Sequence, residues 1–297
     1  MNKITFGIFT IITASVMMMT GCQKDNPVDT DTSSIATEDA ARSVAGTVGQ
    51  DNGGALDQAS DVADLAGAQG LSGGADLLVD KYGKLALATT IDTTYDPSTG
   101  KWTLSLARTR GTVGGTFYAA ITRTYVFQFL NAGGQPQKYW RVIGTNGIDT
   151  ARSIRFDITG GTGEHHAVGF SQKLNSVHGS WVVTGTNTDT ITINGTYSRS
   201  AVDTITTRNA VRTLDHTINL ALTNVTGPRS SRGNMAARTG GTITGTYSAV
   251  ATFSRGSLYS DKTINRDFTI TLGGGNSTIN IGGKVFTGIL SSGDLNP

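Results

Sequence analysis

Apolar and polar residues alternate along most of the chain from Lys84 onward. In 102–106 (Trp-Thr-Leu-Ser-Leu) and in 154–158, every second residue is apolar. Successive side chains of a β-strand point to opposite faces, so this period of two predicts strands with one apolar face and one face rich in Thr, Ser and Asn. Similar stripes follow at 115–130, 181–197, 218–222, 243–253, 264–272 and 279–289.

Turn-forming residues separate these stripes. One example is 96–100 (Asp-Pro-Ser-Thr-Gly), and Gly-rich runs occur at 133–136, 160–163 and 273–276. In such turns Pro fixes φ and Asp bonds the backbone. Because no helical pattern is long enough for crossover connections, the strands are expected to pair as antiparallel hairpins. The predicted fold is all-β: a large antiparallel meander forming a sandwich or an incompletely closed barrel, with one face over a core and the other in water.

A different pattern precedes the strands, in an acidic, Ala- and Gly-rich leader at 34–82. Apolar residues recur there at helical spacing in 35–48 and 56–66, and Thr37 is the expected N-cap of the first helix. Such short helices are marginal alone, so we expect them to pack on the β domain or to fray. The predicted organisation is a flexible tether at 22–33, this short helical leader, and the β domain at 83–297.

The N-terminus has the pattern of a secretory signal peptide over 1–21. Lys3 precedes an uncharged, mostly apolar run that is shorter than the roughly 20 residues of a membrane-spanning helix. The run ends in Met19-Thr20-Gly21-Cys22, which resembles a bacterial lipobox. That resemblance implies cleavage before Cys22, the only Cys in the chain, and lipidation of its side chain. The alternatives are a secreted protein with a free Cys and an uncleaved N-terminal anchor.

The lipobox resemblance also implies a location. A lipid-anchored chain would sit in the bacterial cell envelope, with the membrane as its partner through Cys22. The residue after Cys22 is Gln23 and not Asp, which favours the outer membrane. The domain would then face the periplasm or the outside. If Cys22 is lipidated, the mature chain has no thiol for an internal disulfide and relies on packing and hydrogen bonds.

Charge is distributed unevenly along the chain. Residues 23–82 carry 11 acidic and 3 basic groups, whereas 83–297 carry 20 basic and 11 acidic groups. A basic domain can attract an anionic ligand or lipid. The simpler interpretation is that the acidic leader folds against the basic domain. Because the basic residues are scattered over many strands, no nucleic-acid partner is expected.

Few residues suggest catalysis or metal binding, and no catalytic, cofactor or metal site is predicted. The sequence contains no G-x-S-x-G nucleophile elbow, no H-E-x-x-H zinc motif, no P-loop and no EF-hand loop. Glu164-His165-His166 is the best metal-ligand candidate, yet adjacent strand residues point to opposite faces. His178 and Asp215-His216 can join it only through the tertiary fold. Asn187-Thr188-Asp189 has oxygen ligands for calcium but the composition of a hairpin turn.

Two further groups are weighed as site residues. A hydrolase needs two facing carboxyl groups, and those of the β domain are isolated in the sequence: Asp149, Asp157, Asp203, Asp215, Asp261 and Asp267. Aromatic residues can line a sugar or lipid surface, but on strands they more often belong to the core: Tyr118, Tyr125, Trp140, Trp181, Tyr197 and Tyr247.

A short pattern, T-[VI]-x-G-T-[FY], occurs three times, starting at 112, 192 and 242. A Gly at this place allows a strand to bend or admits a facing aromatic ring. The unequal spacing argues against a solenoid. Duplication of a hairpin and chance similarity both remain open.

The sequence therefore predicts a non-enzymatic cell-envelope lipoprotein with a binding or scaffolding role and an unknown ligand. One alternative is a carrier that holds a lipid or another amphiphile in an apolar half-barrel. A second is a glycan-active hydrolase, which needs two carboxyl groups roughly 5–9.5 Å apart across a cleft.

Overall fold

The computed structural model describes residues 29–67, 88–144, 147–229 and 235–296. The signal segment and Cys22 lie outside these residues. The helices are α1 (Asp29–Val48), α2 (Ala55–Ala66) and α4 (Met235–Arg238). The strands are β1 (Ala88–Asp96), β2 (Lys101–Gly111), β3 (Tyr118–Leu130), β4 (Pro136–Gln137), β5 (Arg141–Gly144), β6 (Gly147–Thr150), β7 (Ser153–Ala167), β8 (Phe170–Thr184), β9 (Thr190–Thr206), β10 (Val211–Pro228), β11 (Gly240–Arg255), β12 (Leu258–Gly273), β13 (Asn276–Ile281), β14 (Lys284–Ile289) and β15 (Leu295–Asn296).

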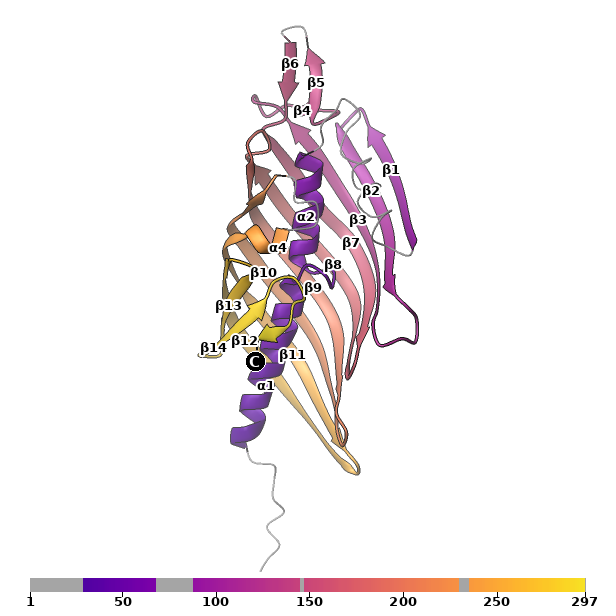
Figure 1. Ribbon diagram of the computed structural model, residues 1–297, viewed down its shortest axis with the longest axis vertical. Coiled ribbons are helices and arrows are strands. Elements are labelled where there is room, and N and C mark those ends of the chain that lie inside the picture. Colours follow the sequence, from indigo (N-terminus) through magenta and orange to yellow (C-terminus); the bar gives the residue numbers. More distant parts are fainter. Residues whose placement is uncertain (1–28, 68–87, 145–146, 230–234, 297) are drawn as a thin grey trace, which may run out of the picture.

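The strands form one large antiparallel meander. The 13-stranded sheet has the order β1-β2-β3-β7-β8-β9-β10-β11-β12-β13-β14-β15, with β4 beside β3, and β5 and β6 form a separate hairpin. The end strands β1 and β15 do not pair, so the sheet is not closed into a barrel. It curves around the helices (Figure 1). The predicted antiparallel meander is confirmed, in its open, incompletely closed form and not as a sandwich.

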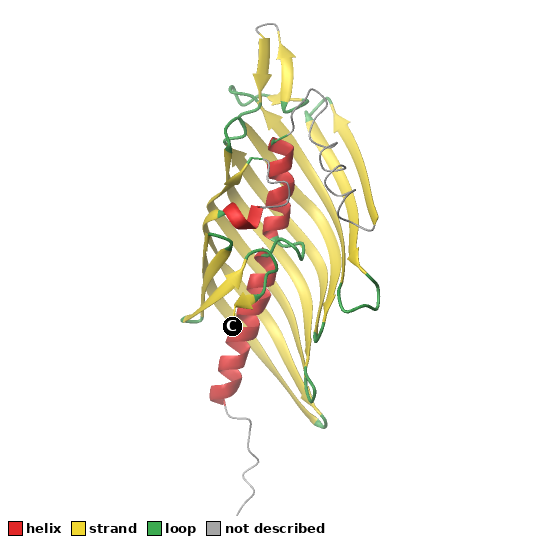
Figure 2. Ribbon diagram, in the orientation of Figure 1, coloured by secondary structure: helices red, strands yellow, loops and turns green. Residues whose placement is uncertain are grey.

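The concave face of this sheet, which we call the trough, holds the helices. Figure 2 shows α1 and α2 running one after the other along it. Nearly every residue of α2 is buried, and helix residues such as Val44 and Leu56 share one core cluster with strand residues such as Phe156. Small Ala side chains on both helices allow this close approach to the sheet. The expectation that the leader packs on the β domain is thus confirmed.

A row of aromatic rings crosses the trough from strand to strand. The ring centroids of Tyr125 and Phe156 are 4.8 Å apart, those of Phe156 and Trp181 are 5.6 Å apart, and those of Trp181 and Tyr197 are 6.4 Å apart. These residues come from the neighbouring strands β3, β7, β8 and β9. Cross-strand aromatic contacts of this kind stabilise the pairing of adjacent strands.

The structure corrects four local predictions. The Gly-rich run 160–163, expected to be a turn, lies within β7, where it pairs with β3. Helix α1 begins at Asp29, so Thr37 lies inside it instead of capping it, and the last residues of the predicted tether 22–33 are helical. The long strand predicted at 115–130 begins only at Tyr118, and Phe117 is exposed in the preceding loop. A helix can begin before the first apolar residue of its pattern, because backbone hydrogen bonds propagate it without side-chain packing.

Two of the three T-[VI]-x-G-T-[FY] segments occupy similar places in the sheet. Gly195 on β9 and Gly245 on β11 pair with Leu222 and Leu220 on the two sides of β10. A Cβ at Gly195 would overlap the carbonyl oxygen of Ser180, and a Cβ at Gly245 would lie 2.6 Å from the ring of Phe268. The third segment, 112–117, instead forms the loop between β2 and β3.

We predict that Gly195→Ala lowers the free energy of unfolding by about 3 kcal/mol, because the new Cβ meets backbone on β8 and the φ of 149° suits Gly. Gly273→Ala is the control, since a Cβ there meets no atom within 4 Å. Its effect should stay within about 0.5 kcal/mol. Urea unfolding followed by tryptophan fluorescence measures both, and equal stabilities of the two variants would contradict this account of the motif.

Candidate functional site

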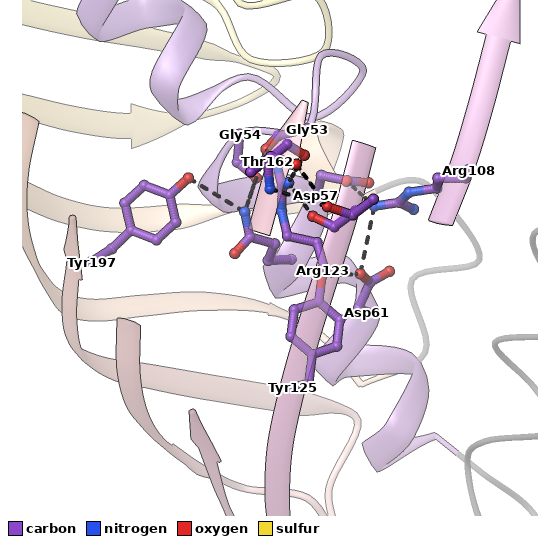
Figure 3. A network of polar contacts seen from close by, with 11 residues as sticks. Gly53, Gly54, Asp57, Asp61, Arg108, Arg123, Tyr125, Thr162 and Tyr197 are labelled. Atoms are coloured by element: carbon purple, nitrogen blue, oxygen red, sulfur yellow. Dashed lines mark hydrogen bonds and ion pairs between the residues drawn. The ribbon is translucent and has the colours of Figure 1, made fainter. Parts of the chain in front are cut away.

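Carboxylates of α2 meet a buried arginine of the sheet (Figure 3). Asp57 and Asp61 are four residues apart and share one face of the helix. Arg108, on the inward face of β2, forms an ion pair with Asp57 and lies 3.7 Å from Asp61. Burial alone would lower the pKa of Arg108, but the two carboxylates outweigh it and raise that pKa. Arg108 is therefore held as a buried cation by the helix.

Tyr125 completes this contact from β3. Its hydroxyl donates a hydrogen bond to Asp61 over 2.9 Å. Burial, and then the charge of Asp61, raise the pKa of Tyr125 well above its usual value. The phenol accordingly stays protonated and acts as a donor to the carboxylate.

A second arginine holds the turn between α1 and α2. Arg123 donates to the carbonyl oxygens of Gly53 and Thr162 at 3.0 Å each. Gln58 also donates to Gly53, over 3.3 Å, and to the hydroxyl of Tyr197 at the same distance. Burial lowers the pKa of Arg123. Figure 3 shows Arg123 reaching Gly53 in this turn, which is thereby fixed to the sheet.

A separate polar cluster lies further along the trough, around Asp203 of β9. Its carboxylate accepts hydrogen bonds from Ser43 at 2.6 Å and from Gln172 at 2.7 Å, and His216 Nε2 lies 3.1 Å away. Gln172 in turn accepts from Arg199, which also donates to the carbonyl of Gly46 over 3.5 Å. Burial would raise the pKa of Asp203, but His216, Ser43 and Gln172 together lower it. This cluster ties α1 to β8, β9 and β10.

The Asp203 cluster contains Ser, His and Asp, yet it lacks the geometry of a hydrolase triad. In a triad the base stands between the nucleophile and the carboxylate. Here Asp203 stands between Ser43 and His216, and the described contacts include none from Ser43 to His216. All three are buried, with exposures of 3%, 1% and 0% for Ser43, His216 and Asp203. The arrangement supports the helix and not nucleophilic attack.

The uneven charge of the chain is partly neutralised inside the molecule. Asp39 of α1 lies 3.1 Å from Arg212 of β10, as Asp57 and Asp61 face Arg108. Burial raises the pKa of Asp39 to about 6, although Arg212 acts to lower it. Leader carboxylates thus face basic residues of the sheet, as the simpler interpretation of the charge pattern expects.

The outer face of the sheet carries two pockets with both polar and apolar lining residues. One, of about 760 Å³, crosses β7 to β11 and is lined by Asp157, His178, Thr196 and Asn219 among others. The other, of about 950 Å³, crosses β2 to β9 and is lined by Glu164, His166, Lys173 and Asn175 among others. Hydroxyl, amide and imidazole groups there offer both donors and acceptors of hydrogen bonds.

The candidate metal ligands lie in different parts of the fold. His165 contacts the rings of Phe117 and Phe170, whereas His166 faces the outer pocket with Glu164, 3.8 Å away. Burial lowers the pKa of His165. His178 lies in the other outer pocket and His216 is buried in the trough. Over the described residues, no group of three or more His, Cys, Asp or Glu could hold a metal ion.

The candidate carboxylates and aromatic residues likewise do not gather in one site. Asp203 is buried in the trough, and Asp157 lies in an outer pocket. Asp189 belongs to the β8–β9 turn, where the Thr188 amide donates to Gly185. The remaining carboxylates are partly or fully exposed on strands: Asp149, Asp215, Asp261 and Asp267. Of the aromatic residues, Tyr118 is half-buried and the others belong to the core: Tyr125, Trp140, Trp181, Tyr197 and Tyr247.

The residues that join helix and sheet were largely missed by the sequence analysis. Their signal is a charged residue in the inward phase of an alternating strand, as in Leu104-x-Leu106-x-Arg108. Arg123 shows the same signal among the apolar residues of its stripe. Such a residue predicts a buried partner of opposite charge or a set of carbonyl oxygens.

In comparisons with known proteins, no protein-family model, curated protein or solved structure matches the chain. Among the described residues, no helix is both long and apolar enough to cross a membrane.

We predict that Asp39→Asn removes a component of the pH dependence of stability. A carboxyl group whose pKa is raised from 3.8 to about 6 favours the folded state when protonated, so its contribution is lost as the pH rises from about 4 to about 6. The lost free energy of unfolding is at most about 3 kcal/mol. Urea unfolding at several pH values measures it. Asp267→Asn, at an exposed position of β12, is the control. An unchanged slope in Asp39→Asn would contradict the prediction.

We further predict strong coupling between Arg108 and Asp57. Arg108→Met leaves Asp57 and Asp61 without their cation and should lower the free energy of unfolding by about 3–5 kcal/mol. Asp57→Leu leaves Arg108 with Asp61 alone and should cost less than Arg108→Met. The double variant should cost less than the sum, by about 1–3 kcal/mol. The control is the exposed pair Arg42 and Glu38, whose removal should cost less than about 1 kcal/mol. Additive losses at Arg108 and Asp57 would argue against the contact.

Proposed function

We propose that this chain is a non-enzymatic, lipid-anchored protein of the bacterial cell envelope whose outer sheet face binds a partner or acts as a scaffold. The observation that carries the proposal is that α1 and α2 fill the trough. In the described part of the chain, the outer face is therefore the broad sheet surface left for binding. Its pockets present hydroxyl, amide and imidazole groups beside apolar side chains, which suit a ligand that has hydrogen-bonding groups and some apolar surface.

The filled trough favours this function over a lipid carrier. A carrier needs an apolar hollow wide enough for acyl chains. Here the inward side chains of the strands form one core cluster with Val44, Leu56 and Leu65 of the helices. Displacing α2 would expose apolar side chains and the buried charge of Arg108.

The outer pockets favour binding over glycan hydrolysis. Hydrolysis of a glycosidic bond uses a pair of carboxyl groups facing one another. Each outer pocket is lined by a single carboxylate, Asp157 in one and Glu164 in the other. Neither pocket thus contains the required pair among its lining residues.

The anchor is tested in cells with Cys22→Ser. We expect the parent chain to incorporate radioactive palmitate and to fractionate with the envelope membranes, whereas Cys22→Ser is unlabelled and released. Thr20→Ser, which keeps the Cys, is the matched control and should behave as the parent. A Cys22→Ser chain that remains equally bound to membranes would refute the anchor.

The binding face is tested by purifying the chain from native membranes and identifying molecules that co-purify by mass spectrometry. Thr196→Lys with Thr246→Lys places long side chains in one outer pocket and should abolish the co-purifying species. Thr103→Lys with Thr271→Lys adds the same charge at exposed strand positions outside both pockets and is the control. Equal recovery with both double variants would count against these pockets as the binding face.

A further inference from the structure

Four hairpin turns lie at the same end of the sheet. They connect β2 to β3, β7 to β8, β9 to β10 and β11 to β12, and Figure 1 shows them along the lower rim of the molecule. We call the residues of these turns and their flanks the tip rim: 111–118, 166–171, 206–211 and 254–259.

The tip rim exposes large apolar side chains. Every one of its four hairpins carries at least one, with exposures between 39% and 84%: Val113, Phe117, Val168, Val211, Leu258 and Tyr259. These are more than half of the large exposed apolar residues in the described chain. Isolated exposed apolar residues need no explanation, but their recurrence on successive tips at one end marks an interaction site.

Charge on the tip rim has one sign. Arg208 and Arg255 are exposed there, and the four segments contain no Asp or Glu. On the sheet strands the nearest carboxylates are Glu164 and Asp261, two residues further along. From α1, Asp39 comes close as well, but it is paired with Arg212 at 3.1 Å. The opposite end of the sheet is mixed, because its turns and hairpin include Asp96, Asp149 and Asp189. A rim of apolar tips with basic side chains suits a surface of anionic headgroups over an apolar layer.

The chain enters the trough from the same end. Asp39 pairs with Arg212, next to a tip, Ser43 with Asp203 further along β9, and Gly46 with Arg199 beyond it. Residues that precede Asp39 in α1 therefore point toward the tip rim. Cys22 is seven residues before Asp29, where α1 begins, and a fully extended chain of that length spans at most about 25 Å. The proposed anchor is thus kept near the tips.

We propose that the tip rim rests on the lipid bilayer, with its apolar side chains in the interfacial layer and Arg208 and Arg255 against anionic headgroups. This inference rests on the proposed anchor, since the tether brings the rim to the membrane. Separate tips on a curved rim suit a fluid bilayer, which deforms around each side chain, better than a protein partner, which needs one complementary patch. Tyr259 and Phe117 are residue types that favour the interface.

The contact is tested with the chain from residue 23, carrying an N-terminal hexahistidine tag that a nickel-chelating lipid holds on phosphatidylethanolamine–phosphatidylglycerol vesicles. This tether replaces the acyl anchor, so the result does not depend on lipidation of Cys22. Val168→Cys and Ile143→Cys each provide a single thiol for an environment-sensitive fluorophore. We expect the label at 168 to brighten and to be quenched by spin-labelled lipid, and the label at 143, on the opposite hairpin, to stay aqueous. An aqueous label at 168 overturns the proposal.

A second measurement uses the untagged chain and its partition onto the same vesicles. Phe117→Ser with Tyr259→Ser should weaken partition about tenfold or more, from lost apolar burial. Arg208→Gln should weaken it about fivefold, an effect absent on phosphatidylcholine vesicles. Ile143→Ser with Ile148→Ser is the matched control and should change nothing. Equal losses in both double variants would refute the bilayer contact. It would also be refuted if raising the protein concentration without vesicles buried the label at 168.

The two proposals fail in different ways. If palmitate labelling of Cys22 fails while the label at 168 is quenched by lipid, the rim contacts membranes without an acyl anchor. If labelling succeeds while the label at 168 stays aqueous, the anchor is right and the rim contact is wrong.

Discussion

The interaction on which this structure depends is the contact between the helices and the buried arginines of the trough. A guanidinium removed from water is costly unless charges or hydrogen-bond acceptors surround it. Arg108 finds both in Asp57 and Asp61. Arg123 finds the carbonyl oxygen of Gly53 at the turn that leads into α2, and that of Thr162 on β7. Two carboxylates one helical turn apart face the same guanidinium in only one rotation of the helix, so these contacts also fix how α2 sits in the sheet.

This arrangement changes what the curved sheet can do. A half-open meander alone would leave a wide apolar hollow, which suggests a carrier. With α1 and α2 in place, the hollow becomes a core, and Asp203 adds a second polar connection between α1 and three strands. The described surfaces that remain for recognition are the hydroxyl-rich outer face and the rim of hairpin tips. The first suits a ligand that has hydrogen-bonding groups and some apolar surface, and the second suits a bilayer near the point where the chain enters the fold.

How far the sequence predicts the fold differs from element to element. Alternation in 102–106 and 154–158 gave the correct strands because a half-exposed antiparallel strand has a period of two. The interpretation that a Gly of the repeated pattern admits a facing aromatic ring is correct at Gly245, which faces Phe268, whereas Gly195 meets the backbone of β8. The same pattern at 112–117 forms a loop. Helix α1 is longer than its apolar pattern predicts, because its first residues, 29–34, are all polar and therefore show no apolar spacing. The polar clusters escaped prediction, since Ser43, Gln172, Asp203 and His216 are far apart in the chain and each is unremarkable alone.

By itself, the sequence determined the type and direction of pairing of the strands, the two-sided character of the sheet, and the presence of an acidic helical leader. These follow from local rules, because strand period, turn residues and helical spacing act over a few residues. Only the tertiary structure decided that the sheet stays open, that the leader fills its concave face, and that apolar tips gather at the end where α1 enters. These properties depend on curvature and on contacts between residues more than a hundred positions apart, such as Ser43 and Asp203, which no local pattern encodes.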